Sequence, residues 1–236
     1  MKTFLAFALS VALLPLQAVA AESKPTVESV LSKYVTAVGG KAAVEKITSL
    51  AMEGTMEIFG TTGEFRTFQK ANKAAWTFVG QDGTHSHHFD GEKGWKKNPL
   101  GVQELTPQEL RGMKQMAELH LETHLTKVFP NLQFKGTETI NGEEAHILES
   151  NPSAEISDRL AFSVKTGLLV EQSSRDGSLK TKFQFQDFKT VDGVQRPHSM
   201  TQTLESPEGT LDLVFKWKSI QSNKELKDEL FARPQG

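Results

Sequence analysis

Two pairs of histidines are the residues of this chain whose spacing could support metal or acid–base chemistry. His85 and His87 are two positions apart, so a β-strand would present both imidazoles on one face, with His88 on the other. Neutral imidazole is a common zinc ligand, but a zinc site needs at least a third protein ligand, and the sequence does not single one out. We favour the simpler interpretation, a polar strand face that leads into the loop after Phe89.

His120 and His124 are four positions apart, which would place them on one face of a helix, near Glu118 and Glu122. Zinc proteases use such a pair in the order His-Glu-x-x-His, where the glutamate acts as the general base. Here Leu121 follows the first histidine, so the base is missing. We interpret His124 as a residue on the half-apolar face of a helix, and we predict no metal site.

The sequence offers no other catalytic signature. It contains no cysteine, which excludes disulfides, thiolate zinc sites and thiol nucleophiles. It has no nucleophile elbow, phosphate-binding glycine loop or dinucleotide fingerprint. The adjacent carboxylates Glu143 and Glu144 belong to a turn, where solvated charge is the simpler explanation. We predict a protein without catalytic residues or cofactor, and we keep a metal-dependent enzyme using His85 and His87 as the third hypothesis.

The first 20 residues have the pattern of a secretory signal peptide. Lys2 precedes an apolar run over residues 4–16, and the small-x-small triplet Ala18-Val19-Ala20 follows. This run is too short for a permanent membrane-spanning helix, and no later stretch reaches the roughly 20 apolar residues that one needs. We expect a cleaved signal over residues 1–20 and a single exported domain over residues 21–236, with no permanent membrane anchor.

The charge pattern argues against polyanionic partners. The chain has 27 Lys plus Arg against 29 Asp plus Glu, a formal net charge of −2, and the two signs are interspersed without a basic tract. Nucleic acid and anionic membrane surfaces are therefore poor partner candidates.

Two helices and one short helical piece are expected. Apolar residues recur at helical spacing from Val27 to Val38, Gly39 and Gly40 end that segment, and a shorter helical piece follows over residues 41–47. A helix cap at Thr106, with a first-turn proline after it, predicts a second helix that runs toward Phe129.

Most of the remaining chain, over residues 50–217, alternates apolar and polar residues in short runs separated by glycine-bearing turns. This is the period of half-buried strands, and the turns at 141–142, 165–167, 175–177 and 192–193 are typical of hairpins. We predict a mainly β (α+β) fold of roughly ten strands, a strongly curved antiparallel sheet with the helices lying against one side.

One face of this sheet would be rich in methionine and aromatic residues. The stripe consists of Met52, Met56, Phe65, Trp76, Phe78, Phe183, Phe185, Met200, Leu213, Phe215 and Trp217. If it faces the concave side, it forms the predicted ligand-binding lining, and flexible Met side chains with flat aromatics suit a ligand that must be released. The alternative is an ordinary core filled by the helices.

The order of the turn motifs resembles a known family. The motifs are Phe89-Asp90-Gly91-x-x-Gly94-Trp95, Gly142 with Ala145 and Ile147, Thr166-Gly167-Leu168-Leu169, Asp192-Gly193-Val194-x-x-Pro197 and Leu230-Phe231-x-x-Pro234. They are similar to the LolA/LolB-like superfamily of bacterial outer-membrane lipoprotein-sorting proteins, over nearly the whole chain after residue 20. Each motif alone is only a hairpin signature, and the order carries the resemblance.

The resemblance implies an incomplete β-barrel with helices over its open side and an apolar cavity between them. In the carrier branch that cavity takes the acyl chains of a lipoprotein through the periplasm. The receptor branch is lipid-anchored through a cysteine, which this chain lacks. We therefore expect a periplasmic carrier or binding protein for lipid or lipoprotein acyl chains. The alternative is a cell-envelope protein-interaction module, with another envelope protein as partner and a filled cavity.

Overall fold

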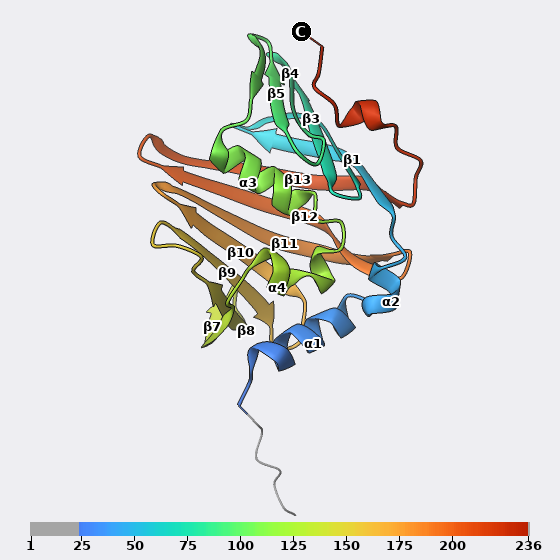
Figure 1. Ribbon diagram of the computed structural model, residues 1–236. Helices are drawn as coiled ribbons and strands as arrows, with labels where there is room; N and C mark the ends of the chain where they lie inside the picture. Colours follow the sequence, from blue (N-terminus) through green and yellow to red (C-terminus); the bar gives the residue numbers. More distant parts are fainter. Residues whose placement is uncertain (1–23, 236) are drawn as a thin grey trace, which may run out of the picture.

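One antiparallel sheet of 13 strands forms the body of the protein, and its α-helices lie on one of its faces (Figure 1). The computed structural model describes residues 24–235. The first six strands are β1 (Ser49–Ile58), β2 (Thr61–Lys70), β3 (Lys73–Gly80), β4 (Gly83–Phe89), β5 (Gly94–Asn98) and β6 (Gly101–Glu104). The other seven are β7 (Gln133–Ile140), β8 (Glu143–Ser150), β9 (Ile156–Ser163), β10 (Leu169–Asp176), β11 (Leu179–Val191), β12 (Val194–Ser206) and β13 (Gly209–Ser222).

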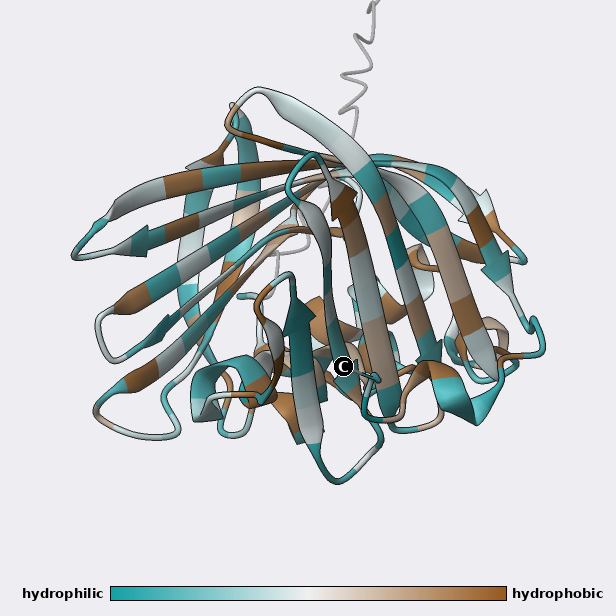
Figure 2. Cartoon of the chain, turned by 90° about the horizontal axis from the view of Figure 1, so that it is seen from above, coloured by the Kyte–Doolittle hydropathy of each residue, from teal (hydrophilic) through white to brown (hydrophobic). Residues whose placement is uncertain are grey.

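The sheet consists of two meanders that share one junction. Strands β1 to β6 pair in sequence order, as do β7 to β13, and β1 then pairs with β13. The sheet does not close, so β6 and β7 are its two edges. Figure 2 shows the strands arched over the helices, which confirms the predicted open, curved half-barrel.

The predicted hairpin turns are confirmed, because their residues supply the backbone angles that tight turns need. Asn141 and Gly142 both have positive φ between β7 and β8, and Asp192 and Gly193 do so between β11 and β12. The strand count of roughly ten was too low. The hairpin of β5 and β6 was missed because its strands have only five and four residues, too few to establish an alternating pattern.

The first helix is confirmed and the second prediction was wrong in extent. Helix α1 (Val27–Ala37) is capped by Thr26, and α2 (Lys41–Val44) follows the two glycines. Helix α3 (Pro107–Met116) begins at the predicted cap on Thr106 but does not continue to Phe129. The chain passes instead through the 3-10 helix η1 (Leu121–Thr123) and the short helix α4 (Leu125–Val128).

The break after α3 lets the chain change direction over the sheet. The backbone at His120 and His124 leaves the helical region, with φ near −108° and −114° and positive ψ. This geometry buries Leu125 and Phe129 in the same core as α1. A straight helix would have carried these side chains past the core, so burial outweighs helical continuity here.

Different segments cover the two faces of the sheet. On the concave face, α1, η1 and α4 pack on strands β1, β8 and β9 in a core that includes Tyr34, Leu148 and Phe162. On the convex face, the C-terminal segment with η2 (Asp228–Leu230) buries Leu226 and Phe231. In the described part of the chain, no helix has the length and apolar character to span a membrane. The predicted signal peptide, residues 1–20, lies outside the described residues, and the domain limits 21–236 stay a prediction.

The junction between the meanders depends on Gly54. The register of β1 against β13 shifts between Glu53 and Gly54, and Gly54 lies opposite Trp217. A Cβ atom on Gly54 would stand 2.1 Å from the carbonyl oxygen of Lys216, closer than any backbone contact allows. Only glycine lets the two strands approach so closely at this shift.

Replacing Gly54 by alanine should therefore destabilise the fold. We expect Gly54→Ala to lower the free energy of unfolding by about 1–3 kcal/mol through steric overpacking, measured by urea denaturation. Gly112→Ala is the matched control, because Gly112 is exposed within α3 and a Cβ there meets no atom within 4 Å. The control should be neutral or stabilising by up to about 1 kcal/mol. Equal stability of the two variants would contradict the steric account.

Candidate functional site

All eleven residues of the predicted lining lie on the concave face of the sheet. The strand register sets this: Phe65 is opposite Phe78, Met56 is opposite Phe215, and Phe215 is opposite Met200. Phe185 is opposite Met200 in turn. The helix-covered core residues Leu148 and Leu160 follow the same alternation on β8 and β9. The strand register thus places these residues on one face, and ligand contact by them stays a prediction.

Five of the eleven form an aromatic cluster that packs on itself. Met56, Phe65, Phe78, Phe215 and Trp217 are 4–8% exposed. The ring of Phe65 lies 4.9 Å from that of Phe215 and 5.4 Å from that of Trp217, centroid to centroid. Among the described residues, this cluster contains no helix side chain. The curvature of the sheet brings its members together, so this part of the wall is largely filled.

The other six lining residues are only half-buried: Met52, Trp76, Phe183, Phe185, Met200 and Leu213. Four of them, Phe183, Phe185, Met200 and Leu213, lie on the adjacent strands β11, β12 and β13, and we call these four the open strip. The rings of Phe183 and Phe185 are stacked with centroids 6.4 Å apart. The open strip lies between the aromatic cluster, which Met200 and Leu213 contact, and the helix-covered core, which Phe185 contacts.

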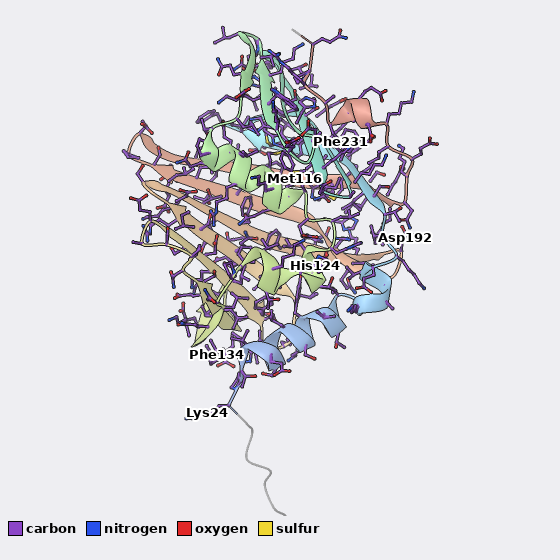
Figure 3. The ribbon with its side chains drawn as sticks, viewed as in Figure 1. Lys24, Met116, His124, Phe134, Asp192 and Phe231 are labelled. Atoms are coloured by element: carbon purple, nitrogen blue, oxygen red, sulfur yellow. The ribbon has the colours of Figure 1, made fainter. Side chains whose placement is uncertain are left out.

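Helix α3 lies across the concave face and contacts strands of both meanders. Its Met113 and the following Ala117 pack against Ala74 and Phe89 on β3 and β4. On the opposite wall, Arg111 Nη2 donates to both carboxylate oxygens of Asp158 on β9, at 2.8 and 2.7 Å. Figure 3 shows Met116, near the end of α3, in front of the sheet. One helix thus ties together walls from the two different meanders.

A second ion pair lies deeper, beneath η1. Arg196 on β12 donates through Nη1 to Glu122 on η1, and both side chains are 11% exposed. Tyr34 of α1 is close enough for Glu122 to affect it: burial above all, and the Glu122 charge next, raise the pKa of the Tyr34 hydroxyl. Sequence analysis missed this pair because its partners are 74 positions apart and neither belongs to a motif.

The histidine pairs do not form a metal site. His85 and His87 share a strand face as predicted, but His85 Nε2 meets Asp82 at 3.0 Å and the His87 ring lies 4.3 Å from Trp76. Burial lowers the pKa of His87 to about 4, so its imidazole is neutral near pH 7. In the described chain no group of three or more His, Cys, Asp or Glu side chains could hold a metal ion.

The second histidine pair serves the fold of the α3–α4 segment. His120 Nε2 lies 2.7 Å from the carbonyl oxygen of Ile47, and His124 Nδ1 lies 2.9 Å from Glu118 Oε1. Their rings are 5.9 Å apart, although the two residues do not lie on one continuous helix. Figure 3 places His124 on the helix-bearing side of the sheet.

The two best-formed pockets among the described residues lie away from the predicted lining. One of about 410 Å³ is bordered by Asn72, Gly91, Lys114 and His120, where α3 meets the turns of the first meander. Another of about 320 Å³ lies on β9 to β12 and is lined mostly by charged and hydroxyl side chains. The predicted lining is thus an open apolar face of the sheet, not an enclosed pocket.

Comparison with known proteins finds no family model and no curated protein that matches the sequence. Solved structures do match. A DUF1329 family protein from Desulfovibrio piger aligns with a TM-score of 0.56 at 14% identity, over 87% of this chain and 97% of its own. A LolA superfamily protein from Nitrosomonas europaea aligns at 0.57 and 14% identity, over 88% and 98%. This chain has the LolA/LolB-like fold.

A further structure agrees with the LolA/LolB-like fold. It is a candidate outer membrane lipoprotein-sorting protein domain from Vibrio parahaemolyticus, with a TM-score of 0.58 and 14% identity, over 86% of this chain and 96% of its own. At such identity the LolA/LolB-like similarity establishes the fold and leaves the ligand to be argued from the residues.

Removing Arg111 from the Arg111–Asp158 ion pair should destabilise the fold, and the loss of stability should depend on pH. Burial raises the pKa of Asp158 above its ordinary value, while Arg111 opposes that shift. Arg111→Gln leaves the Asp158 carboxylate, which is 2% exposed, without its cation. We expect a loss of about 3 kcal/mol at pH 7.

Protonation of Asp158 relieves that loss. Because the pKa of Asp158 in the folded variant lies above its unfolded value, stability is lost as pH rises through the folded pKa and regained as pH falls toward 3.8. Guanidinium titrations of Arg111→Gln at pH 7 and pH 4.5 measure this effect. The double variant Arg111→Gln/Asp158→Asn is the control, and should be more stable than Arg111→Gln at pH 7. A pH-independent deficit would contradict this account.

Proposed function

We propose that this protein is a periplasmic carrier or binding protein for a hydrophobic ligand, held non-covalently on the concave face of its LolA/LolB-like sheet. The observation that carries the proposal is the open strip. Phe183, Phe185, Met200 and Leu213 keep apolar surface exposed on the inner face of a curved sheet. Contiguous apolar patches of more than a few hundred Å² on soluble proteins mark binding sites, and these four side chains are neighbours on adjacent strands.

Acyl chains suit this surface. The open strip joins the aromatic cluster through Met200 and Leu213, which pack against that cluster, so a flexible chain can follow continuous apolar surface across the strands. Each buried methylene contributes about 0.8 kcal/mol, and a chain of some fourteen would contribute roughly 11 kcal/mol before ordering costs. Because the concave face covers the chain only in part, binding gains only part of this free energy. The lower affinity favours a ligand that is bound and then released.

Localisation belongs to the same proposal. The signal pattern over residues 1–20 and the fold shared with a LolA superfamily protein support export to the periplasm. The proposal is for binding without catalysis, and it treats the contacts of His85, His87, His120 and His124 with Asp82, Trp76, Ile47 and Glu118 as structural.

One observation favours a second candidate, an envelope protein-interaction module of the same fold. The aromatic cluster is buried by its own members, which leaves less of the interior for a ligand than a hollow wall would. Such a module would work through its surface and would bind no acyl chain. The two candidates therefore differ in whether the protein binds an acyl chain, which can be measured.

Acyl binding should depend on the open strip. Among the described residues, Phe183 belongs to neither the helix-covered core nor the aromatic cluster, so replacing it costs little folding energy. We expect Phe183→Asp to weaken binding of an uncharged fluorescent acyl probe at least about tenfold, since a buried Phe contributes roughly 1.5–3 kcal/mol. Fluorescence titration measures the dissociation constant.

Leu100→Asp is the matched control. Leu100 is 91% exposed in the turn between β5 and β6, away from the open strip, and its replacement adds the same charge. Probe affinity should stay at the wild-type value. Absence of probe binding to the wild-type protein would overturn the carrier proposal and favour the interaction module, and equal loss in both variants would remove the open strip as the site.

A further inference from the structure

The guanidinium of Arg196 has hydrogen-bonding capacity that the described residues do not use. Its Nη1 donates to Glu122, while Nε and Nη2 are buried and have no hydrogen-bond partner in residues 24–235. Glu122 Oε2 is likewise buried without a partner there. Buried donors are almost always satisfied in folded proteins, so two on one side chain need an explanation.

The two free donors form one edge of the guanidinium. Nε–H and Nη2–H point the same way in its plane, at the spacing of the two oxygens of a carboxylate or of two oxygens of a phosphate. A guanidinium carries five N–H donors and can hold anions on two edges at once. Arg196 can thus keep Glu122 on one edge and accept a second oxyanion on the other.

Arg196 is placed at the helix-covered end of the lining. Alternation along β12 puts Arg196, His198 and Met200 on the concave face, with Met200 in the open strip. Met200 is four positions along the strand from Arg196, roughly 13 Å. Met52 and Ile220 pack against both the helix-covered core and the aromatic cluster. Apolar surface is therefore continuous between the aromatic cluster and the helix-covered core, and Arg196 lies close enough to Tyr34 of that core for its charge to affect the Tyr34 pKa.

We propose that the ligand is an acyl chain with an oxyanion head, and that Arg196 Nε and Nη2 hold this head while the chain lies along Met200, Phe185 and Phe183. The inference rests on the proposed function and specifies its ligand class. The head is the carboxylate of a long-chain fatty acid or the phosphate of a single-chain lysophospholipid, which present the same edge of oxygens.

Glu122 sets how tightly the head is held. With its carboxylate already on Nη1, a second anion shares one cation with it and meets the charge of Glu122 Oε2. The repulsion between the two anions lowers the affinity for the head. Because Glu122 belongs to η1, the position of η1 directly affects release of the ligand.

Matched ligands test the inference on the purified protein. Palmitate, palmitoyl lysophosphatidate and methyl palmitate share one chain and differ in the head, and each is titrated below its aggregation concentration against a bound uncharged fluorescent acyl probe. We expect at least one of the two anions to bind at least about tenfold more tightly than the ester, the factor that hydrogen bonds to a charged group contribute. The tighter of the two identifies the head.

Variants at the two residues move the result in opposite directions. Glu122→Gln should tighten binding of the anion and leave the ester unchanged. Arg196→Gln should lower the affinity of the anion to that of the ester. The double variant Glu122→Gln/Arg196→Gln avoids a stranded buried carboxylate and should behave like Arg196→Gln. Lys216→Gln, which removes an exposed cation from the strand β13, should keep the wild-type preference.

The outcomes separate this inference from the proposed function. Equal affinity of both anions and the ester for the wild-type protein would overturn the oxyanion head and leave hydrophobic binding intact. A preference for the anions that survives the double variant would overturn the role of Arg196. Failure of all three ligands and the probe to bind would overturn the proposed function together with the inference.

Discussion

The pairing of β1 with β13 is the constraint on which the rest of this structure depends. Each meander forms by local hairpins, but only this long-range pairing makes one curved sheet of them. It requires Gly54, where the strands come too close for any side chain. The curvature then gathers Phe65, Phe215 and Trp217, from both meanders, into one aromatic cluster. The apolar inner wall is thus a product of the junction and not of either half alone.

The segments over the concave face are held by a few polar contacts in apolar surroundings. Arg111 pairs α3 with Asp158 on β9, and Glu122 pairs η1 with Arg196 on β12. Partly buried ion pairs add little net stability compared with apolar contacts of the same volume, but they penalise any arrangement that leaves one partner alone. The role of these two ion pairs is to specify where α3 and η1 lie on the sheet.

Local signals in the sequence predicted much of the fold. Alternation assigned all eleven lining residues to one face, and paired turn residues such as Asn141-Gly142 located the hairpins. These signals failed where the outcome depends on distant contacts. The helix starting at Pro107 stops at Met116 because burial of Phe129 requires a bend, and the pairs of Arg111 and Arg196 join residues 47 and 74 positions apart. How far helices and neighbouring side chains fill the concave face also depends on tertiary packing, which strand periodicity does not encode.

The two free edges, β6 and β7, give the sheet a property that a closed cylinder lacks. In a closed barrel the strand number and stagger fix the radius, so the interior has one size. Here no ladder of backbone hydrogen bonds joins the first strand of the order to the last. The spacing between β6 and β7 is set by the curvature of the paired strands and by the α3–α4 segment that joins the two edges, not by a direct pairing between them. An open sheet of this type can change its curvature without breaking a strand pairing.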